Sequence, residues 1–296
     1  MILSTDVGNE IDDQWAITYL LTSSNFDVQG IISAHAPSLP DPSAHYTYKI
    51  LVDVVEKRLG LLTHPPLFEG SSLPLADRST PRRNRGVDFV LATSQHYSKA
   101  KPLVILTIGA ATDVASAILL DPTICERIKI VAMGFKNLDA GGGKEYNVEN
   151  DPRAWQVILE SQAPVVIGSG DVCQAYLALK FKEAESMLHA HGEIGRWLWE
   201  EYQAWYFRSV KPLRVPDFSK PWIIWDIVTL AYVEGMANAK QVPRPRLANN
   251  LSFEKPDRER SIEWVISVDS HKMWADFLRD IDLHQATHHI HPEPQH

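Results

Sequence analysis

Acidic residues are concentrated at the very start of the chain. Asp6, Glu10, Asp12 and Asp13 fall within eight positions, directly behind the apolar residues 1–3. An apolar run followed by Gly, Asn and clustered Asp is typical of a buried strand that ends in a loop. Several carboxylates gathered in one loop need a cation, and ligands that are all oxygen favour a hard ion such as Ca²⁺ or Mg²⁺. A helix N-terminus alone would favour Asp12 or Asp13, but it does not explain Asp6.

A second polar group follows the apolar residues 103–108. The segment 109–113 has the composition of a turn from a strand into a helix. Thr112 or Asp113 could simply cap that helix. Carbonyl groups exposed in such a turn could also bind a hard cation.

The third group is the glycine-rich segment 141–143 with the polar residues behind it. It is no phosphate-binding P-loop, because Gly-Lys is not followed by Ser or Thr. Glu145 and Asn147, two positions apart, would point the same way on an extended backbone and could bind the hydroxyls of a polyol. The alternative is a flexible surface loop that Asp151 ends by capping the next helix.

Two late segments are aromatic. Trp225 and Asp226 follow an apolar run, and taken by itself Asp226 is explained as the N-cap of the next helix. Residues 193–208 read as a helix that is unusually rich in Trp and Tyr. Such a helix more often belongs to a core, but it could also form an aromatic wall for a planar ring. We expect Trp205 or Tyr206 to close over that ring as a lid.

Short apolar runs alternate with longer amphipathic stretches, and this alternation predicts an α/β fold. We expect an open, mainly parallel, doubly wound sheet with helices on both faces and a helical subregion over the cleft. The polar groups follow the strands, and ligands of such sheets bind beyond the carboxyl ends of the strands, so one cleft should collect them. The expected strands are 1–5, 28–34, 103–108, 128–133, 164–168 and 261–268. The expected helices are 12–23, 43–59, 86–99, 111–120, 151–162, 193–208 and 270–281, with another from about 226.

Composition narrows the class of protein. The 296 residues are 45% hydrophobic and carry a formal net charge of −8, which argues against a nucleic-acid partner. Two distant cysteines, Cys125 and Cys173, indicate neither a disulfide framework nor a zinc site. No signal peptide or membrane span is recognised, so we expect a cytoplasmic protein. We expect a single domain over residues 1–296, of which the histidine-rich stretch 283–296 would be a disordered tail.

Taken together and in order, four segments resemble the nucleoside hydrolases, the calcium-dependent nucleoside N-ribohydrolases of the inosine/uridine-preferring type. Each segment alone would be weak evidence for the family, but the four segments in this order are specific to it. The matching segments are residues 6–13, 108–115, 145–152 and 225–226.

The resemblance implies a metal site and a residue that acts as general base. Ca²⁺ would be held by Asp6, Asp13, Asp226 and the carbonyl of Thr112. Asp6 would also deprotonate the attacking, metal-bound water. Three carboxylates around one divalent ion leave a net negative charge, which suits an oxocarbenium-like transition state.

The resemblance also implies substrate contacts. Asp12, Glu145 and Asn147 would bind the ribose hydroxyls, and Asn137 is a candidate for one further contact. Trp225 stands where many purine-active members have a His that helps the base to leave.

The predicted function is therefore Ca²⁺-dependent hydrolysis of a nucleoside, or a related N-riboside, to ribose and free base. One alternative is a calcium-dependent protein that binds a sugar or nucleoside without turnover. The other is a Mg²⁺-dependent phosphatase with Asp6 as nucleophile, which lacks the basic residues that phosphate transfer needs, since Lys144 is the only close candidate. The resemblance implies a homodimer or homotetramer.

Overall fold

The computed structural model describes residues 1–209 and 220–287. Its centre is an eight-stranded sheet with the strand order β3-β2-β1-β4-β5-β6-β10-β9. The strands are β1 (Ile2–Thr5), β2 (Gly30–Ser33), β3 (Leu67–Glu69), β4 (Leu103–Thr107), β5 (Ile128–Met133), β6 (Val165–Gly168), β9 (Ala237–Leu247) and β10 (Phe253–Val268). A separate two-stranded sheet pairs β7 (Ala178–Leu179) with β8 (Trp222–Ile223).

The sheet is parallel from β3 through β10, and only β9 runs antiparallel, as the partner of β10. The chain passes from β1 outward to β2 and β3, then returns to the other side of β1 to form β4. The order of the strands therefore reverses between β1 and β4. Their carboxyl ends diverge at such a point, which is where open α/β sheets bind ligands.

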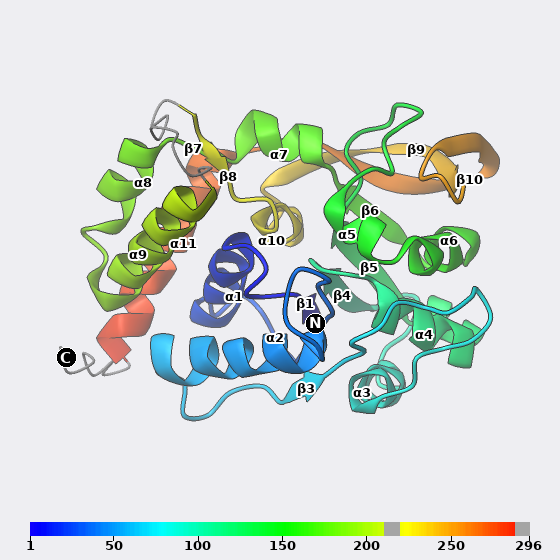
Figure 1. Ribbon diagram of the computed structural model, residues 1–296, viewed down its shortest axis with the longest axis horizontal. Coiled ribbons are helices and arrows are strands. Elements are labelled where there is room, and N and C mark those ends of the chain that lie inside the picture. Colours follow the sequence, from blue (N-terminus) through cyan, green and yellow to red (C-terminus); the bar gives the residue numbers. More distant parts are fainter. Residues whose placement is uncertain (210–219, 288–296) are drawn as a thin grey trace.

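Helices cover both faces of the sheet (Figure 1). One side carries α1 (Asp12–Thr22), α2 (Ser43–Val52) and α10 (Ile227–Val233), with α8 (Phe181–Leu188), α9 (Gly192–Ser209) and α11 (Ser270–Thr287) farther out. The other side carries α3 (Arg85–Ser94), α4 (Thr112–Leu120) and α6 (Pro152–Glu160). Two short helices, α5 (Tyr146–Asn150) and α7 (Gly170–Tyr176), begin near the carboxyl ends of β5 and β6.

Alternate residues of each central strand enter opposite cores. Leu3 and Val131 belong to the core that contains α1, whereas their neighbours Ile2 and Ile130 belong to the core that contains α4. This follows from the two-residue repeat of a strand. Because both faces are covered, these strands are mainly apolar, and the polar residues Ser4, Thr5, Ser33 and Thr107 stand at their carboxyl ends.

The last helix packs against the first. In α1, Trp15 stacks on Phe277 of α11, with ring centroids 5.7 Å apart. The Tyr19 hydroxyl donates a 2.8 Å hydrogen bond to Asp276 of the same helix. Burying polar groups costs free energy unless they are paired, so this bond fixes how the two helices meet. The C-terminal helix thus braces the helix that begins with the acidic residues.

The predicted α/β class and mainly parallel sheet are confirmed, but several elements differ from expectation. Strands β3, β7, β8 and β9 and helices α5, α7 and α8 were not predicted. The expected disordered tail is wrong for residues 283–287, which form the last turns of α11, and 288–296 lie outside the described residues. No helix in the described part of the chain is long and apolar enough to cross a bilayer.

Candidate active site

A cavity of about 350 Å³ lies at the carboxyl ends of the central strands. Its floor consists of buried residues at or beyond the carboxyl ends of β1, β4, β5 and β6 and directly before α10. Its mouth consists of exposed and partly exposed residues from the surrounding loops and helix starts. The floor residues are Asp6, Asp12, Asp13, Ile108, Met133, Asn147, Gly170 and Asp226. The mouth residues are Asn9, Glu10, Lys136, Lys144, Glu145, Tyr146, Gln174 and Trp225.

The loop after β1 brings the first carboxylate to the floor. Gly8 has φ +103°, a conformation that disfavours side chains, and it turns the chain back toward α1. Gly109, at the end of β4, packs directly on this loop, since a Cβ atom there would lie 2.9 Å from the Asp6 amide nitrogen. The loops after β1 and β4 therefore approach closely, and Asp6 is held between them.

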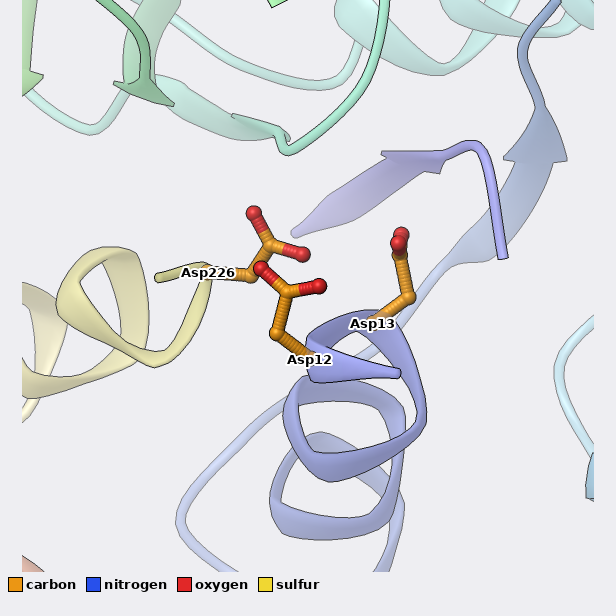
Figure 2. A group of neighbouring side chains, drawn as sticks. All are labelled: Asp12, Asp13 and Asp226. Carbon is orange, nitrogen blue, oxygen red and sulfur yellow. The ribbon is translucent and has the colours of Figure 1, made fainter. Parts of the chain in front are cut away.

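Three more carboxylates meet on the floor (Figure 2). Asp12 and Asp13 begin α1, and Asp226 precedes α10. One oxygen atom from each of the three lies within 4.8 Å of the others. Asp12, Asp13 and Asp226 are at most 4% exposed, and Asp6 is 2% exposed. The hydroxyl of Thr5 donates a hydrogen bond to Asp13 and fixes its orientation.

This arrangement raises the pKa of every floor carboxylate. Burial is the main cause, and repulsion between the carboxylates adds to it. The pKa of Asp12 rises to about 8, through burial and then through the charge of Asp13. Those of Asp6, Asp13 and Asp226 rise well above the usual range.

The floor fits a hard cation. Asp6 Oδ2 is buried and has no hydrogen-bond partner among the described residues. An unpartnered buried carboxylate oxygen costs free energy, and a positive ion removes that cost. The donors offered are oxygen atoms, which suit Ca²⁺ or Mg²⁺ better than a softer metal.

Polar groups suited to hydroxyl binding face the floor from the loop after β5. Both carboxylate oxygens of Glu145 accept backbone hydrogen bonds at 3.1 Å, from the amides of Asn147 and Val148, and so cap α5. Burial raises the Glu145 pKa to about 7. The Asn147 side chain donates to the Ile108 carbonyl at 3.3 Å. The backbone is helical from Tyr146 rather than extended as expected, yet Glu145 and Asn147 both line the cavity.

Hydrogen bonds tie three loops together at the mouth. The Tyr146 hydroxyl donates to Asn9 Oδ1 at 3.0 Å and lies 3.0 Å from the Ser38 hydroxyl. Ser38 also donates to Asn9. The loop after β1, the loop before α2 and the start of α5 are thereby joined beside the cavity.

The opposite side of the mouth contains Trp225. Glu10 lies at the mouth as well, and its pKa is raised to about 8 by burial and by the neighbouring charge of Asp12. Trp225 lines the cavity immediately before the floor residue Asp226. An aromatic ring at this place gives the cavity a flat wall next to its acidic floor.

The sequence model of the family described as inosine-uridine preferring nucleoside hydrolase matches residues 1–275. The chain belongs to this family. Membership indicates a hydrolase that acts on N-glycosyl bonds.

Solved structures of nucleoside hydrolases share the fold. A plant nucleoside hydrolase superimposes with a TM-score of 0.74 at 16% identity, covering 95% of this chain and 98% of the other. A purine-preferring ribonucleoside hydrolase from Gardnerella vaginalis gives 0.70 at 20% identity, with 96% and 98% covered. An uncharacterized protein of Schizosaccharomyces pombe is 33% identical over 111 residues, which are 36% of this chain and 34% of that protein. The solved structures match this chain along nearly its whole length.

Four predicted site residues of this nucleoside hydrolase lie outside the cavity lining, and Thr112 and Asn137 are two of them. The Thr112 hydroxyl donates to Asp151 at 2.6 Å, and its carbonyl accepts a hydrogen bond from Ser116 one helical turn later. This geometry gives Thr112 a structural role at the start of α4 and does not support it as a metal ligand. Asn137 pairs with exposed Asp139 instead of facing the floor.

The geometry does not support the expected aromatic lid either. Tyr206 is buried and packs on Phe181 of α8, with ring centroids 5.2 Å apart. Trp205 packs on Trp222 and lines a different cavity of about 400 Å³, which shares only Glu10 with the first. The aromatic face of α9 therefore serves the outer core, and Trp225 is the tryptophan that lines the candidate site.

Sequence reasoning missed several lining residues. Ile108, Met133 and Lys136 come at or just after the ends of β4 and β5. Their position after predicted strands was a usable signal, although their side-chain types gave none. Tyr146 and Gln174 belong to helices too short for their periodicity to be recognised.

Proposed function

We propose that this protein hydrolyses the N-glycosidic bond of a ribonucleoside or a related N-riboside in a Ca²⁺-dependent reaction. The products are ribose and the free base. The observation that carries the proposal is the set of four buried carboxylates on the cavity floor, one of which has an unpartnered oxygen. Such a group needs a cation, and it also suits a substrate on which positive charge develops.

Asp6, Asp13 and Asp226 would hold the ion. We infer that the neutral ligand is the carbonyl of Ile108 in place of Thr112, because Ile108 lines the cavity and Thr112 does not. When bound, Ca²⁺ orients water and vicinal hydroxyls and polarises them as a Lewis acid.

The protein's own groups carry the remaining steps. Asp6 removes a proton from the attacking water. Asp12, Glu145 and Asn147 accept and donate hydrogen bonds to the ribose hydroxyls and hold the sugar over the floor. The net negative charge that remains stabilises the oxocarbenium-like ribosyl group as the base departs. The base would lie at the mouth, between Trp225 and the Asn9–Tyr146 pair.

Release of reducing sugar from a nucleoside panel, with Ca²⁺ and with chelator, tests the proposal. We expect turnover that chelation abolishes and Ca²⁺ restores. Because water attacks directly, NMR should show inversion at the anomeric carbon in the first product. Calcium binding without release from any N-riboside would refute the enzymatic function, and tight nucleoside binding in that case would identify a binding protein.

Activity on an aryl phosphate would indicate the phosphatase instead. We further propose that the protein is a cytoplasmic homodimer or homotetramer, which sedimentation and fractionation of cells test directly.

A further inference from the structure

Two positive charges at the cavity mouth have no role in the proposed hydrolysis. Lys136 and Lys144 are both exposed, and they are the two basic residues among those that line the cavity. Riboside hydrolysis at an acidic floor requires neither of them. Their position on the wall formed by the loop after β5, next to Glu145, therefore needs a separate explanation.

Neither lysine neutralises the carboxylates. Within residues 1–209 and 220–287, no ion pair or side-chain hydrogen bond joins Lys136 or Lys144 to another side chain. Glu145, which follows Lys144 directly, uses both of its oxygens to accept backbone amides. Elsewhere the same fold does pair a half-buried lysine, since Lys129 lies 2.9 Å from Glu263. The charges of the two mouth lysines thus remain available to a ligand.

One tightly built loop carries both lysines. The Lys136 amide donates to the Gly142 carbonyl at 2.6 Å, and the Lys144 amide donates to Gly141 at 3.2 Å. A Cβ atom at Gly142 would lie 2.0 Å from the Asn137 carbonyl oxygen, so no side chain fits there. A Cβ atom at Gly143 would lie 2.4 Å from the Leu251 carbonyl oxygen, so the closed loop requires glycine at both positions. Its closure brings residues eight apart in sequence to the same wall of the cavity.

This wall adjoins the groups proposed to hold the sugar. Glu145 and Asn147 lie next to Lys144, and Lys136 lies at the other end of the loop. The ion and the attacking water would lie on the floor, with the carboxylates of α1 and Asp226. A ribose held over the floor has one exocyclic carbon, and a substituent on it can extend toward the lysines. Phosphate carries close to two negative charges at neutral pH and accepts hydrogen bonds from ammonium groups.

Resting on the proposed hydrolase function, we propose that Lys136 and Lys144 bind a 5′-phosphate, and that the substrate class is a ribonucleoside 5′-monophosphate. The bond broken is the same N-glycosidic bond, water supplies the hydroxyl group and the proton, and the products are ribose 5-phosphate and free base. The phosphate ester stays intact.

Matched pairs of substrates test this. Release of free base is measured by chromatography, with Ca²⁺ present, for inosine against inosine 5′-monophosphate and for uridine against uridine 5′-monophosphate. We expect kcat/KM to be at least about tenfold higher for the phosphorylated member, as two charge-assisted contacts allow. The double variant Lys136→Met/Lys144→Met should reduce that ratio at least about tenfold. Lys99→Met, an exposed lysine remote from the cavity, is the matched control and should leave the ratio unchanged.

Equal or better turnover of the unphosphorylated member, with a ratio that the double variant does not change, would overturn the proposal. A gain for orotidine over uridine without a gain for the 5′-phosphate would also overturn it, because the lysines would then serve a carboxylate on the base.

Binding separates this proposal from the proposed function. Calorimetry with the calcium-loaded protein compares ribose 5-phosphate with ribose. Tighter binding of the phosphate, lost in the double variant, supports the lysine site even if no N-riboside is hydrolysed, whereas equal affinities refute it even if nucleosides are hydrolysed.

Discussion

Replacing Asp12 with asparagine should stabilise the ion-free protein. Asp12 is 4% exposed, and its folded-state pKa is about 8 against 3.8 for an ordinary aspartate. Below pH 3.8 the group is protonated both folded and unfolded, so it has no effect on stability. As the pH rises toward 8, the unfolded chain releases a proton that the folded chain retains, and the free energy of unfolding falls. Asparagine has nearly the same shape and carries no charge, so it avoids this loss.

The size of the effect follows from the shift. Each pKa unit corresponds to about 1.4 kcal/mol, so the loss accumulated by pH 7 is about 4 kcal/mol. Neighbouring carboxylates share their repulsion, and removing one charge relieves only part of it. We therefore expect a gain of about 2–4 kcal/mol in chelator, or about 3–6 °C in Tm for a chain of this size. At pH 5 the gain should be smaller, because the pH is then only slightly above the unfolded-state pKa of 3.8, so little stability has been lost.

Thermal unfolding of wild type and Asp12→Asn in chelator at pH 5, 7 and 8 measures the gain in Tm. The same measurement with saturating Ca²⁺ shows how much the ion stabilises each protein. The cation offsets the same negative charge, so Ca²⁺ should raise the Tm of the wild type more than that of Asp12→Asn. Glu254→Gln removes a carboxylate from an exposed position and should change neither curve. A variant less stable than the wild type in chelator at pH 8 would refute the reasoning that buried charge dominates this floor.

Three further outcomes follow from the site. Because Asp6 is also a proposed ion ligand, the measurement is made at saturating Ca²⁺, where Asp6→Asn should lower kcat about 10²–10⁴-fold with little change in the calorimetric affinity for ribose, as loss of a general base does; weakened ribose binding with kcat intact would contradict that role. Trp225→Ala should raise KM about tenfold by removing an aromatic wall, while Trp205→Ala should leave KM unchanged. The reverse pattern would support the hypothesis that α9 supplies an aromatic lid. Tyr146→Phe removes the hydroxyl bonded to Asn9 and should raise KM about three- to tenfold at constant kcat, and an unchanged KM would show that the bridged loops do not contribute to binding.

The sheet could be predicted because its strands are buried on both faces and are therefore mainly apolar runs. Strand β9 could not be predicted, since Pro243 and Pro245 disfavour a strand. These prolines are tolerated because β9 lies at the edge of the sheet. Strand β3, also at an edge, has three residues and no recognisable pattern.

The acidic floor could be predicted in outline because carboxylates following strand ends have few structural explanations. The position of a carbonyl ligand could not, since any residue supplies one. Thr112 is the first residue of α4, and helical carbonyls point along the axis toward the next turn, where Ser116 donates to this one. For α9, the aromatic pattern showed that a face is buried but not which partner covers it.

The brace between the first and last helices has a consequence for how the protein is made. Asp12 and Asp13 leave the ribosome early, but Asp226 follows more than 200 residues later, and the Asp276 and Phe277 partners of α1 come later still. Contacts so distant in sequence form late in folding. A nascent chain therefore carries the acidic residues without a site, and the ion can stabilise only the finished molecule. Truncating α11 should abolish calcium binding although this helix supplies no ligand.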